Sequence, residues 1–395
     1  MDTQKIKIAC VFEGDLQDGG GFQTQLSTVY ALSQHLNYQI IAFTFSKKNY
    51  KVLKNLGLET VYVKQFKLDK LLRTLYVRHF FSIFKLKIKT KFEKKLEDSK
   101  IDLVYFLSPS FLALDLISHN YVFTIWDLCH RDLPEFPEVN NFREFENREL
   151  LYNYAPKKAI AVITDSELGR ENCIRRYTLD ADRVFAASFL PSLNISKTKF
   201  IDIREKYNII GEYIFYPAQF WSHKNHIYII DAISDLKREG VLLHVVFSGS
   251  DKGNLQYVLD YAKKMNVYDL VKYIGFAPNE EIFYLYKQSL ALVMPSYFGP
   301  TNIPPLEAFA IGTPVIYSNL LGLREQVADA ALLCDLRNPK SLVEHLKTLM
   351  NNPDKRIELI RKGQRRLNEL QKISVLEVLI QIFDDYMIKL KCWKS

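Results

Sequence analysis

One nearly uncharged turn of this 395-residue sequence has the side chains and backbone groups of a ligand site. Residues 295–316, PSYFGPTNIPPLEAFAIGTPVI, hold a single charged residue, Glu307. The pattern predicts a strand end, a turn and a helix with prolines in its first turn, where a missing N–H costs nothing. We expect the free amides of Thr301, Asn302 and Ile303, together with the helix dipole, to bind an anion.

Glu307 falls in the first or second turn of that predicted helix. The simpler interpretation is that its carboxylate complements the helix dipole. It does not complete a capping box, because no Ser or Thr lies three residues before it. The interpretation that we favour is that Glu307 accepts hydrogen bonds from vicinal hydroxyls, such as those of a ribose.

Two other segments place ligand-binding groups directly after predicted strands. In YPAQFWSHKNHIYIIDAI, residues 216–233, Lys224 lies between a strand and a helix, where its ammonium group can neutralise phosphates. Gly19, Gly20 and Gly21 follow the first strand, and without side chains they let a ligand approach the backbone. Each signal is weak by itself, since a lysine at a helix start is usually solvated and GGG does not match the GxGxxG dinucleotide motif.

Apolar runs that alternate with helical patterns predict an α/β fold with parallel sheets. Five runs, beginning with IKIACVF, lie within residues 1–190, and six more lie within residues 200–372. We therefore predict two doubly wound domains, with ligands at the carboxyl ends of their strands. Residues 190–209 lack strong periodicity and are predicted to be a connecting loop. The tail, 373–395, contains an amphipathic helix from Ser374 to about Lys389.

The net charge of +8 is concentrated in residues 64–100, which hold twelve Lys or Arg and four Asp or Glu. Aromatic and aliphatic residues are interleaved with these bases. Two interpretations remain open: a basic amphipathic surface that binds an anionic membrane leaflet, or a solvated helix face that covers the core. Nucleic acid is disfavoured as a partner, because no helix-turn-helix, zinc-ligand or RNA-binding signature accompanies the charge.

Cysteine usage and hydropathy predict a cytoplasmic protein, soluble or peripheral on a membrane. The five cysteines show no CxxC spacing, which favours a reducing compartment. The sequence begins without a secretory signal pattern. Its longest uncharged run, residues 288–306, contains four prolines and is not expected to span a membrane.

Taken together, these features resemble glycosyltransferase family 4, the retaining GT-B enzymes that use nucleotide-sugars. The resemblance covers most of the chain and is strongest in residues 216–233, 271–296 and 304–335. The first half agrees through GGG, TIWDLCHRDLPEF and VITDSE. The resemblance implies two Rossmann-like domains that face each other across a cleft, with the C-terminal helix crossing back to the first domain.

Carried over by position, the resemblance implies that Lys224 contacts the donor diphosphate and Glu307 the nucleotide ribose. It places Glu325 near the nucleotide, and Gly20 and Gly21 near the donor phosphates from the other domain.

The resemblance also places Asp127 and His130, in the segment WDLCHRD, among the acceptor and sugar contacts. A surface-loop histidine is the alternative for His130. Farther along the chain, Asp165, Ser166 and Glu167 are predicted to cap the following helix rather than to take part in chemistry.

Three positions depart from the family pattern. Gly299 stands where the first Glu of E-x7-E would contact the transferred sugar, Gln219 where an Arg is frequent, and Trp126-Asp127 where His-Asp is frequent. The change at Gly299 suggests a donor sugar that lacks a hydroxyl there, such as a 6-deoxyhexose, with Asn302 in place of the carboxylate. A Gly299→Glu variant with unchanged donor preference would contradict this hypothesis.

The resemblance implies front-face transfer with retention, in which the departing phosphate oxygen takes the acceptor proton. No DxD-like pair stands where a metal would bridge the diphosphate, so we expect no metal and no other cofactor. The expected acceptor is a glycan or lipid-linked glycan in cell-surface polysaccharide or lipopolysaccharide assembly, at the cytoplasmic face of the inner or plasma membrane. The alternatives are a GT-B-fold sugar-nucleotide epimerase or phosphorylase, or a membrane-associated scaffold with weak catalysis.

Overall fold

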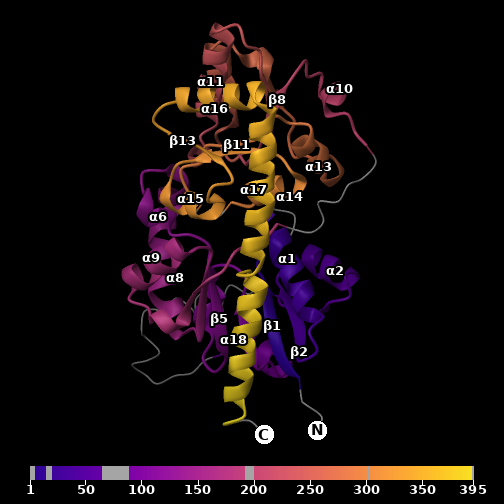
Figure 1. Cartoon of the computed structure of the whole chain (residues 1–395). Helices are drawn as coiled ribbons and strands as arrows, with labels where there is room; N and C mark the ends of the chain where they lie inside the picture. The colour runs from indigo at the N-terminus through magenta and orange to yellow at the C-terminus, as the bar shows by residue number, and fades with distance from the viewer. Residues whose placement is uncertain (1–4, 15–19, 65–88, 192–199, 300–301, 394–395) are drawn as a thin grey trace. The chain divides into compact units, whose positions relative to one another are not determined.

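A computed structural model (Figure 1) describes residues 5–14, 20–64, 89–191, 200–299 and 302–393. The chain divides into two compact units. Unit 1 consists of Met1–Leu128, Arg143–Phe189 and Ile373–Ser395, and unit 2 of Cys129–Phe142 and Leu190–Lys372.

Unit 1 is built on a seven-stranded parallel sheet with the order β3-β2-β1-β4-β5-β6-β7. Its strands are β1 (Ile6–Phe12), β2 (Tyr38–Thr44), β3 (Glu59–Tyr62), β4 (Leu103–Phe106), β5 (Asn120–Ile125), β6 (Ala161–Thr164) and β7 (Val184–Ala186). The five predicted strands are confirmed. The sequence did not predict β3 and β7, because these edge strands have only four and three residues, too few for a clear strand pattern.

Helices cover both faces of this sheet and bury separate apolar layers. They are α1 (Gly20–Ser33), α2 (Lys47–Asn55), α5 (Lys91–Asp98), α8 (Glu144–Lys158), α9 (Glu167–Tyr177) and α18 (Val375–Leu390), with short 3-10 turns η1 (Phe111–Asp115) and η3 (Ala181–Arg183). Ser166 caps α9 by accepting a hydrogen bond from the Gly169 N–H at 3.0 Å, which confirms that predicted cap.

Part of the basic segment 64–100 covers the core of unit 1. In α5, Phe92 and Leu96 are buried, whereas Lys94 and Lys95 are exposed. This stretch therefore has the solvated helix face that was one of the two interpretations. Residues 65–88, on which the membrane-binding interpretation mainly depends, lie outside the described residues.

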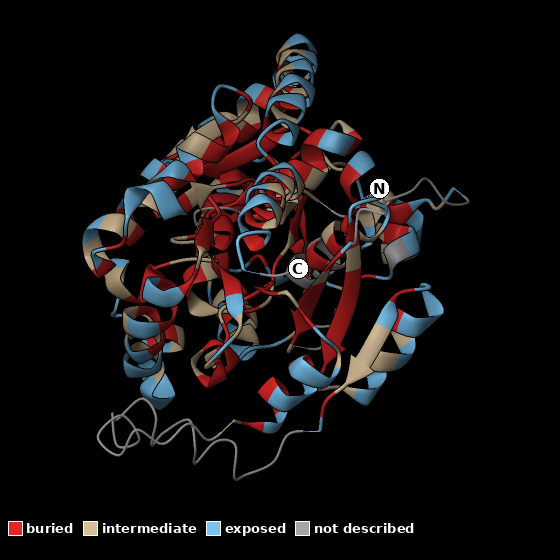
Figure 2. Cartoon of the chain, turned by 90° about the horizontal axis from the view of Figure 1, so that it is seen from below, coloured by how far each residue is buried: buried red, intermediate tan, exposed pale blue. Residues whose placement is uncertain are grey.

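Unit 2 is built on a six-stranded parallel sheet with the order β10-β9-β8-β11-β12-β13. Its strands are β8 (Tyr213–Pro217), β9 (His244–Ser248), β10 (Val271–Tyr273), β11 (Leu292–Met294), β12 (Val315–Ser318) and β13 (Leu332–Cys334). All six were predicted. Figure 2 shows that most strands are buried throughout, while the helices are exposed along one side.

The helices of unit 2 are α6 (Cys129–Asp132), α7 (Pro137–Asn140), α10 (Ile203–Tyr207), α11 (His226–Arg238), α12 (Leu255–Lys264), α13 (Asn279–Lys287), α14 (Ile303–Ile311), α15 (Leu321–Val327), α16 (Lys340–Asn351) and α17 (Pro353–Gln371); η4 (Ser222–Lys224) and η5 (Tyr268–Leu270) are 3-10 turns, and η2 (Asn141–Arg143) spans the unit boundary.

The prediction that residues 190–209 form only a loop is wrong at α10. Asp202 caps this one-turn helix, and Tyr207 donates a hydrogen bond to Glu281 of α13. Five residues are too few for a visible helical period.

Both sheets have the doubly wound order, and each has one point from which successive strands are added in opposite directions across the sheet. In unit 2 this point lies between β8 and β11, because β8 connects onward to β9 on one side and β11 to β12 on the other. The loops after these two neighbouring strands diverge at the carboxyl edge of the sheet. Such an opening is where doubly wound sheets bind ligands.

Helix α18 follows unit 2 in the sequence but packs in the core of unit 1. Leu379 and Phe383 are fully buried there. The Tyr38 hydroxyl donates to Asp384 Oδ1 at 2.6 Å, and the Tyr386 hydroxyl donates to the Asp102 carbonyl at 2.8 Å. Among the described helices, α18 included, none combines the length and apolar character that a membrane span needs.

Helix α17 packs closely against α14 at Gly363. An ideal Cβ at this position would lie 2.5 Å from Cδ1 of Phe309, a buried α14 side chain. We expect Gly363→Ala to lower the stability of the protein by about 1–3 kcal/mol through overpacking, although Ala has the higher helix propensity. Thermal unfolding would measure this loss. Asn368→Ala, on the exposed side of α17, is the control and should leave the melting temperature unchanged or slightly raised. A more stable Gly363→Ala variant would contradict the packing.

Candidate functional site

The switch point of unit 2 brings together two of the predicted donor-site residues. Lys224 ends η4, in the loop after β8, and Asn302 lies in the loop after β11. Lys224 Nζ donates a hydrogen bond to Asn302 Oδ1 at 3.0 Å, although the residues are 78 positions apart in the sequence. The fold thus places a cation at the edge where a doubly wound sheet binds anionic ligands.

The backbone of Lys224 is fixed from both sides of the switch point. The hydroxyl of Tyr216, on β8, donates to the Lys224 carbonyl at 2.8 Å. The N–H of Tyr297, after β11, donates to the carbonyl of His223 at 2.9 Å. The turn that carries the lysine is therefore attached to both loops.

One part of the predicted anion site is wrong. The backbone N–H of Asn302 is not free, because it donates to Gln326 Oε1 at 3.2 Å. The sequence could not show this, since Gln326 lies on another helix, α15, 24 positions later. Thr301 lies outside the described residues, and Ile303 is the first residue of α14.

Gly299 has a backbone conformation that favours glycine. Its φ is +93°, its carbonyl accepts a hydrogen bond from Asn302 Nδ2 at 2.8 Å, and a Cβ would lie 3.2 Å from Asn302 Oδ1. Any side chain here strains the turn and presses on Asn302. Gly299→Glu is therefore a poor test of sugar preference, because a loss of activity would also follow from the displaced Asn302.

Glu307 lies in the second turn of α14 and is paired. The hydroxyl of buried Tyr286 donates to its Oε2 at 2.7 Å. Burial raises the pKa of Glu307 above its ordinary value, and the hydrogen bond from Tyr286 only partly offsets this. The geometry gives the carboxylate a fixed direction. The ribose contact stays a prediction.

Two other predicted donor residues occupy the same unit. Gln219 lies in the loop after β8, and its Oε1 accepts from Trp221 Nε1 at 2.9 Å. Glu325 lies on α15 with a partly exposed side chain, and its carbonyl accepts from Arg366 of α17 at 2.8 Å. Both roles stay predictions.

The remaining predicted residues divide between the units. Gly20 and Gly21 are the first residues of α1, and Asp127 follows β5, where its Oδ1 accepts from Arg148 Nη1 at 2.6 Å. His130 is the second residue of the short helix α6 of unit 2 and is fully buried, so it is not a surface-loop histidine. The roles predicted for these four residues stay predictions.

Residues 129–142 attach to unit 2 beside Lys224, which the sequence did not predict. Glu138 accepts a hydrogen bond from the N–H of His223 at 2.8 Å and also contacts the His223 ring at Nδ1. The His223 ring stacks on Phe298 with centroids 3.9 Å apart, and the Phe136 ring lies 5.3 Å from the Phe298 ring. The residue directly before Lys224 is thereby held, by partners up to 85 positions away in the sequence.

The Glu138 carboxylate is stabilised in its ionised form. Burial by itself would raise its pKa, but hydrogen bonds from the ring and N–H of His223 outweigh burial, and the pKa is lowered. Only 7% of the Glu138 side chain is exposed. Among the described residues, no group of three or more His, Cys, Asp or Glu side chains is arranged to hold a metal ion.

Known proteins are similar to this chain both in the sequence of unit 2 and in the fold of nearly the whole chain. Residues 199–366 match the family model described as Glycosyl transferases group 1. The resemblance to glycosyltransferases is thus confirmed for the unit that contains Lys224.

Two curated relatives are O-antigen chain mannosyltransferases. The chain is 25% identical over 230 residues to O-antigen chain mannosyltransferase B of Escherichia coli, covering 57% of this chain and 60% of the relative. It is 26% identical over 226 residues to O-antigen chain mannosyltransferase RfbU of Salmonella typhimurium, covering 56% and 60%. The match thus spans about 60% of the length of these relatives.

Solved structures confirm the GT-B architecture over nearly the whole chain. A glycosyltransferase from Rickettsia africae superposes with a TM-score of 0.72 at 14% identity, covering 99% of this chain and all of the other. Anabaena HepE in complex with UDP-glucose gives a TM-score of 0.73 at 15% identity, covering 96% and 99%. At these identities the likeness establishes the fold alone.

The pair of Glu138 and His223 generates a prediction for stability against pH. Because the folded-state pKa of Glu138 is lowered, its contribution is present above the unfolded value of 4.5 and is lost as the pH falls through the folded pKa. We expect Glu138→Gln to cost about 1–3 kcal/mol at neutral pH. The stability gap to the parent protein should narrow below pH 4.5.

Denaturant unfolding at several pH values would measure this gap. Glu135→Gln is the matched control, because Glu135 lies in the same segment with an exposed side chain. A gap that stays constant with pH would contradict the ionised pair.

Proposed function

We propose that this chain is a retaining glycosyltransferase that moves a hexose or deoxyhexose from a nucleotide-sugar to a glycan acceptor. The observation that carries the proposal is the Lys224 ammonium group held at the switch point by Asn302, at the start of α14 and within the family-matched domain. A fixed cation at this position suits the diphosphate of a donor. Glu307, in the next turn, suits the ribose hydroxyls.

In this proposal Lys224 acts on the leaving group. The bond between the anomeric carbon and the phosphate oxygen breaks, and the acceptor oxygen forms its bond on the same face of the sugar. The acceptor proton passes to the departing phosphate oxygen. Lys224 stabilises the negative charge that grows on that phosphate, which is electrostatic catalysis by a preorganised donor. No metal is needed for this chemistry.

The proposed biological role is assembly of a cell-surface polysaccharide or lipopolysaccharide. Two relatives named as O-antigen mannosyltransferases support it, and so does the structural likeness to WaaG, described as a glycosyltransferase involved in lipopolysaccharide biosynthesis (TM-score 0.65). The acceptor would then be a glycan carried on a lipid, at the cytoplasmic face of a membrane. The basic residues of the segment 64–100 would suit its anionic surface.

Nucleotide binding tests the proposal most directly. We expect one of the nucleoside diphosphates UDP, GDP, ADP and dTDP, and the nucleotide-sugars that contain it, to raise the melting temperature of the protein in a concentration-dependent way. Lys224→Ala should abolish this shift and lower turnover by on the order of 10²-fold. Lys347→Ala, which removes a surface lysine paired with Glu239, is the control and should behave as the parent. If no nucleotide shifts the parent protein, the transferase is replaced by the scaffold alternative.

The stereochemistry and metal requirement have a separate test. We expect the glycosidic bond of the product to have the anomeric configuration of the donor, as measured by proton NMR during turnover. The rate should be unchanged after treatment with EDTA, since Lys224 supplies the charge that a metal would otherwise supply. An inverted product would contradict retention, and loss of activity with rescue by a divalent cation would contradict metal independence.

A further inference from the structure

We propose that Asn302 and Gln326 position Lys224, and that Asn302 does not replace the missing carboxylate at Gly299 as a contact to the sugar. The inference rests on the proposed function, since Lys224 is taken to meet the donor diphosphate. It assigns to Gln326 a role that no sequence pattern indicated.

Both donors and one of the two acceptor lone pairs of the Asn302 side chain are already engaged. Its Nδ2 donates to the Gly299 carbonyl at 2.8 Å and to the Tyr317 hydroxyl at 2.7 Å, and its Oδ1 accepts from Lys224 Nζ. A carboxamide has two N–H donors, so neither remains for a sugar hydroxyl. Asn302 is only 7% exposed.

The orientation of this carboxamide follows from its neighbours. With O and N exchanged, Nδ2 would face the Lys224 ammonium group and Oδ1 would face the Gly299 carbonyl, two repulsive contacts. The oxygen must therefore point at the lysine.

The side chain of Asn302 does not cap the helix that it precedes, α14. It stands at the N-cap of α14, where Asn is a preferred residue because its side chain accepts from the first amides of the helix. Its side chain makes no such bond here. The capping interaction has been exchanged for the contact with Lys224.

Gln326 holds the backbone of Asn302 by a two-point contact. Its Oε1 accepts from the Asn302 N–H at 3.2 Å, and its Nε2 donates to the Asn302 carbonyl at 2.7 Å. The Tyr317 hydroxyl donates to the same Oε1 at 3.0 Å and closes a ring of buried hydrogen bonds. Such a network has one satisfied arrangement, and loss of one member leaves the others unpaired.

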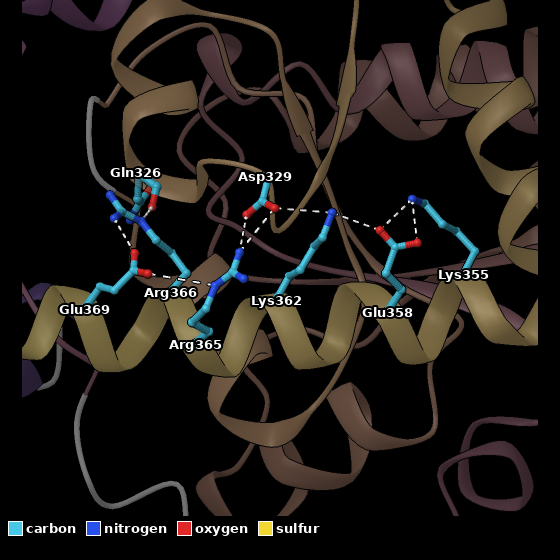
Figure 3. A network of polar contacts seen from close by, with 8 residues as sticks. All are labelled: Gln326, Asp329, Lys355, Glu358, Lys362, Arg365, Arg366 and Glu369. Carbon is cyan, nitrogen blue, oxygen red and sulfur yellow. Dashed lines mark hydrogen bonds and ion pairs between the residues drawn. The ribbon is translucent and has the colours of Figure 1, made fainter.

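Helix α17 anchors this network from outside. Arg366 donates to the carbonyl of Glu325 at 2.8 Å, at the end of α15. It also donates to the carbonyl of Gln326 at 3.1 Å (Figure 3). Its Nη1 also pairs with Glu369 on α17. Gln326 is therefore fixed at its backbone by α17 and at its side chain by Tyr317, far along the sequence from the lysine that it positions.

The test compares Asn302→Leu and Gln326→Ala with Gln288→Ala. Gln288 is the matched control, because its carboxamide makes the same kind of two-point contact with backbone, to the N–H of Ile203 and the carbonyl of Ile201. Thermal unfolding of all three variants would correct for any general loss of stability.

The first readout needs no nucleotide. Trinitrobenzenesulfonate reacts with accessible lysine amines, and the Lys224 amine is held in a hydrogen bond to Asn302 Oδ1. We expect the labelling rate of Lys224, followed by peptide mass spectrometry, to rise several-fold in Asn302→Leu and Gln326→Ala and to stay unchanged in Gln288→Ala. Equal rates in all four proteins would overturn the inference.

The second readout is calorimetric affinity for the nucleoside diphosphate and for its nucleotide-sugar. We expect each of Asn302→Leu and Gln326→Ala to lower the affinity for both ligands by about tenfold. When either substitution is combined with Lys224→Ala, the affinity should be no lower than that of Lys224→Ala alone. If Asn302→Leu weakened only the nucleotide-sugar, Asn302 would be a sugar contact and the inference would fail. A parent protein that binds no nucleotide would refute the proposed function, while the labelling rates would still decide the positioning.

Discussion

The structure of the candidate site depends on one constraint, the divergence of the chain between β8 and β11. In a parallel doubly wound sheet, the loops after these neighbouring strands leave in opposite directions and cannot cover the edge between them. Lys224 and Asn302 come from these two loops, and their hydrogen bond joins the two sides of the opening.

A cation at such an edge needs a neutral support rather than an opposing charge. A carboxylate in contact with Lys224 would compete with a diphosphate for the same ammonium group, whereas a carboxamide oxygen directs the group without cancelling its charge. The carboxylate in this region, Glu307, is instead turned toward Tyr286. The polarity of the site is therefore divided between a positive end suited to phosphate and an acceptor suited to hydroxyls.

The sequence predicted the strands well because buried parallel strands are continuous apolar runs. It singled out Lys224 because it follows a strand and Glu307 because it lies near the start of a helix, and the roles of both stay predictions. It could not predict Gln326, Tyr317 or Glu138. Their partners lie between 9 and 85 positions away, and each contact exists only after the sheet has formed. An isolated buried Gln or Tyr gives no periodic signal. The prediction that the Asn302 N–H is free was wrong for the same reason, because its hydrogen-bond acceptor, Gln326, lies on another helix.

Gly299 departs from the family pattern, and the geometry couples this position to Asn302. The positive φ of Gly299 turns its carbonyl toward Asn302 Nδ2, and the absence of a Cβ leaves room for Asn302 Oδ1. A glutamate at position 299 would disturb the residue that directs Lys224. The glycine at this position thus preserves the support that Asn302 gives to Lys224. A fixed cation is expected of a working donor site, and the scaffold alternative does not require one.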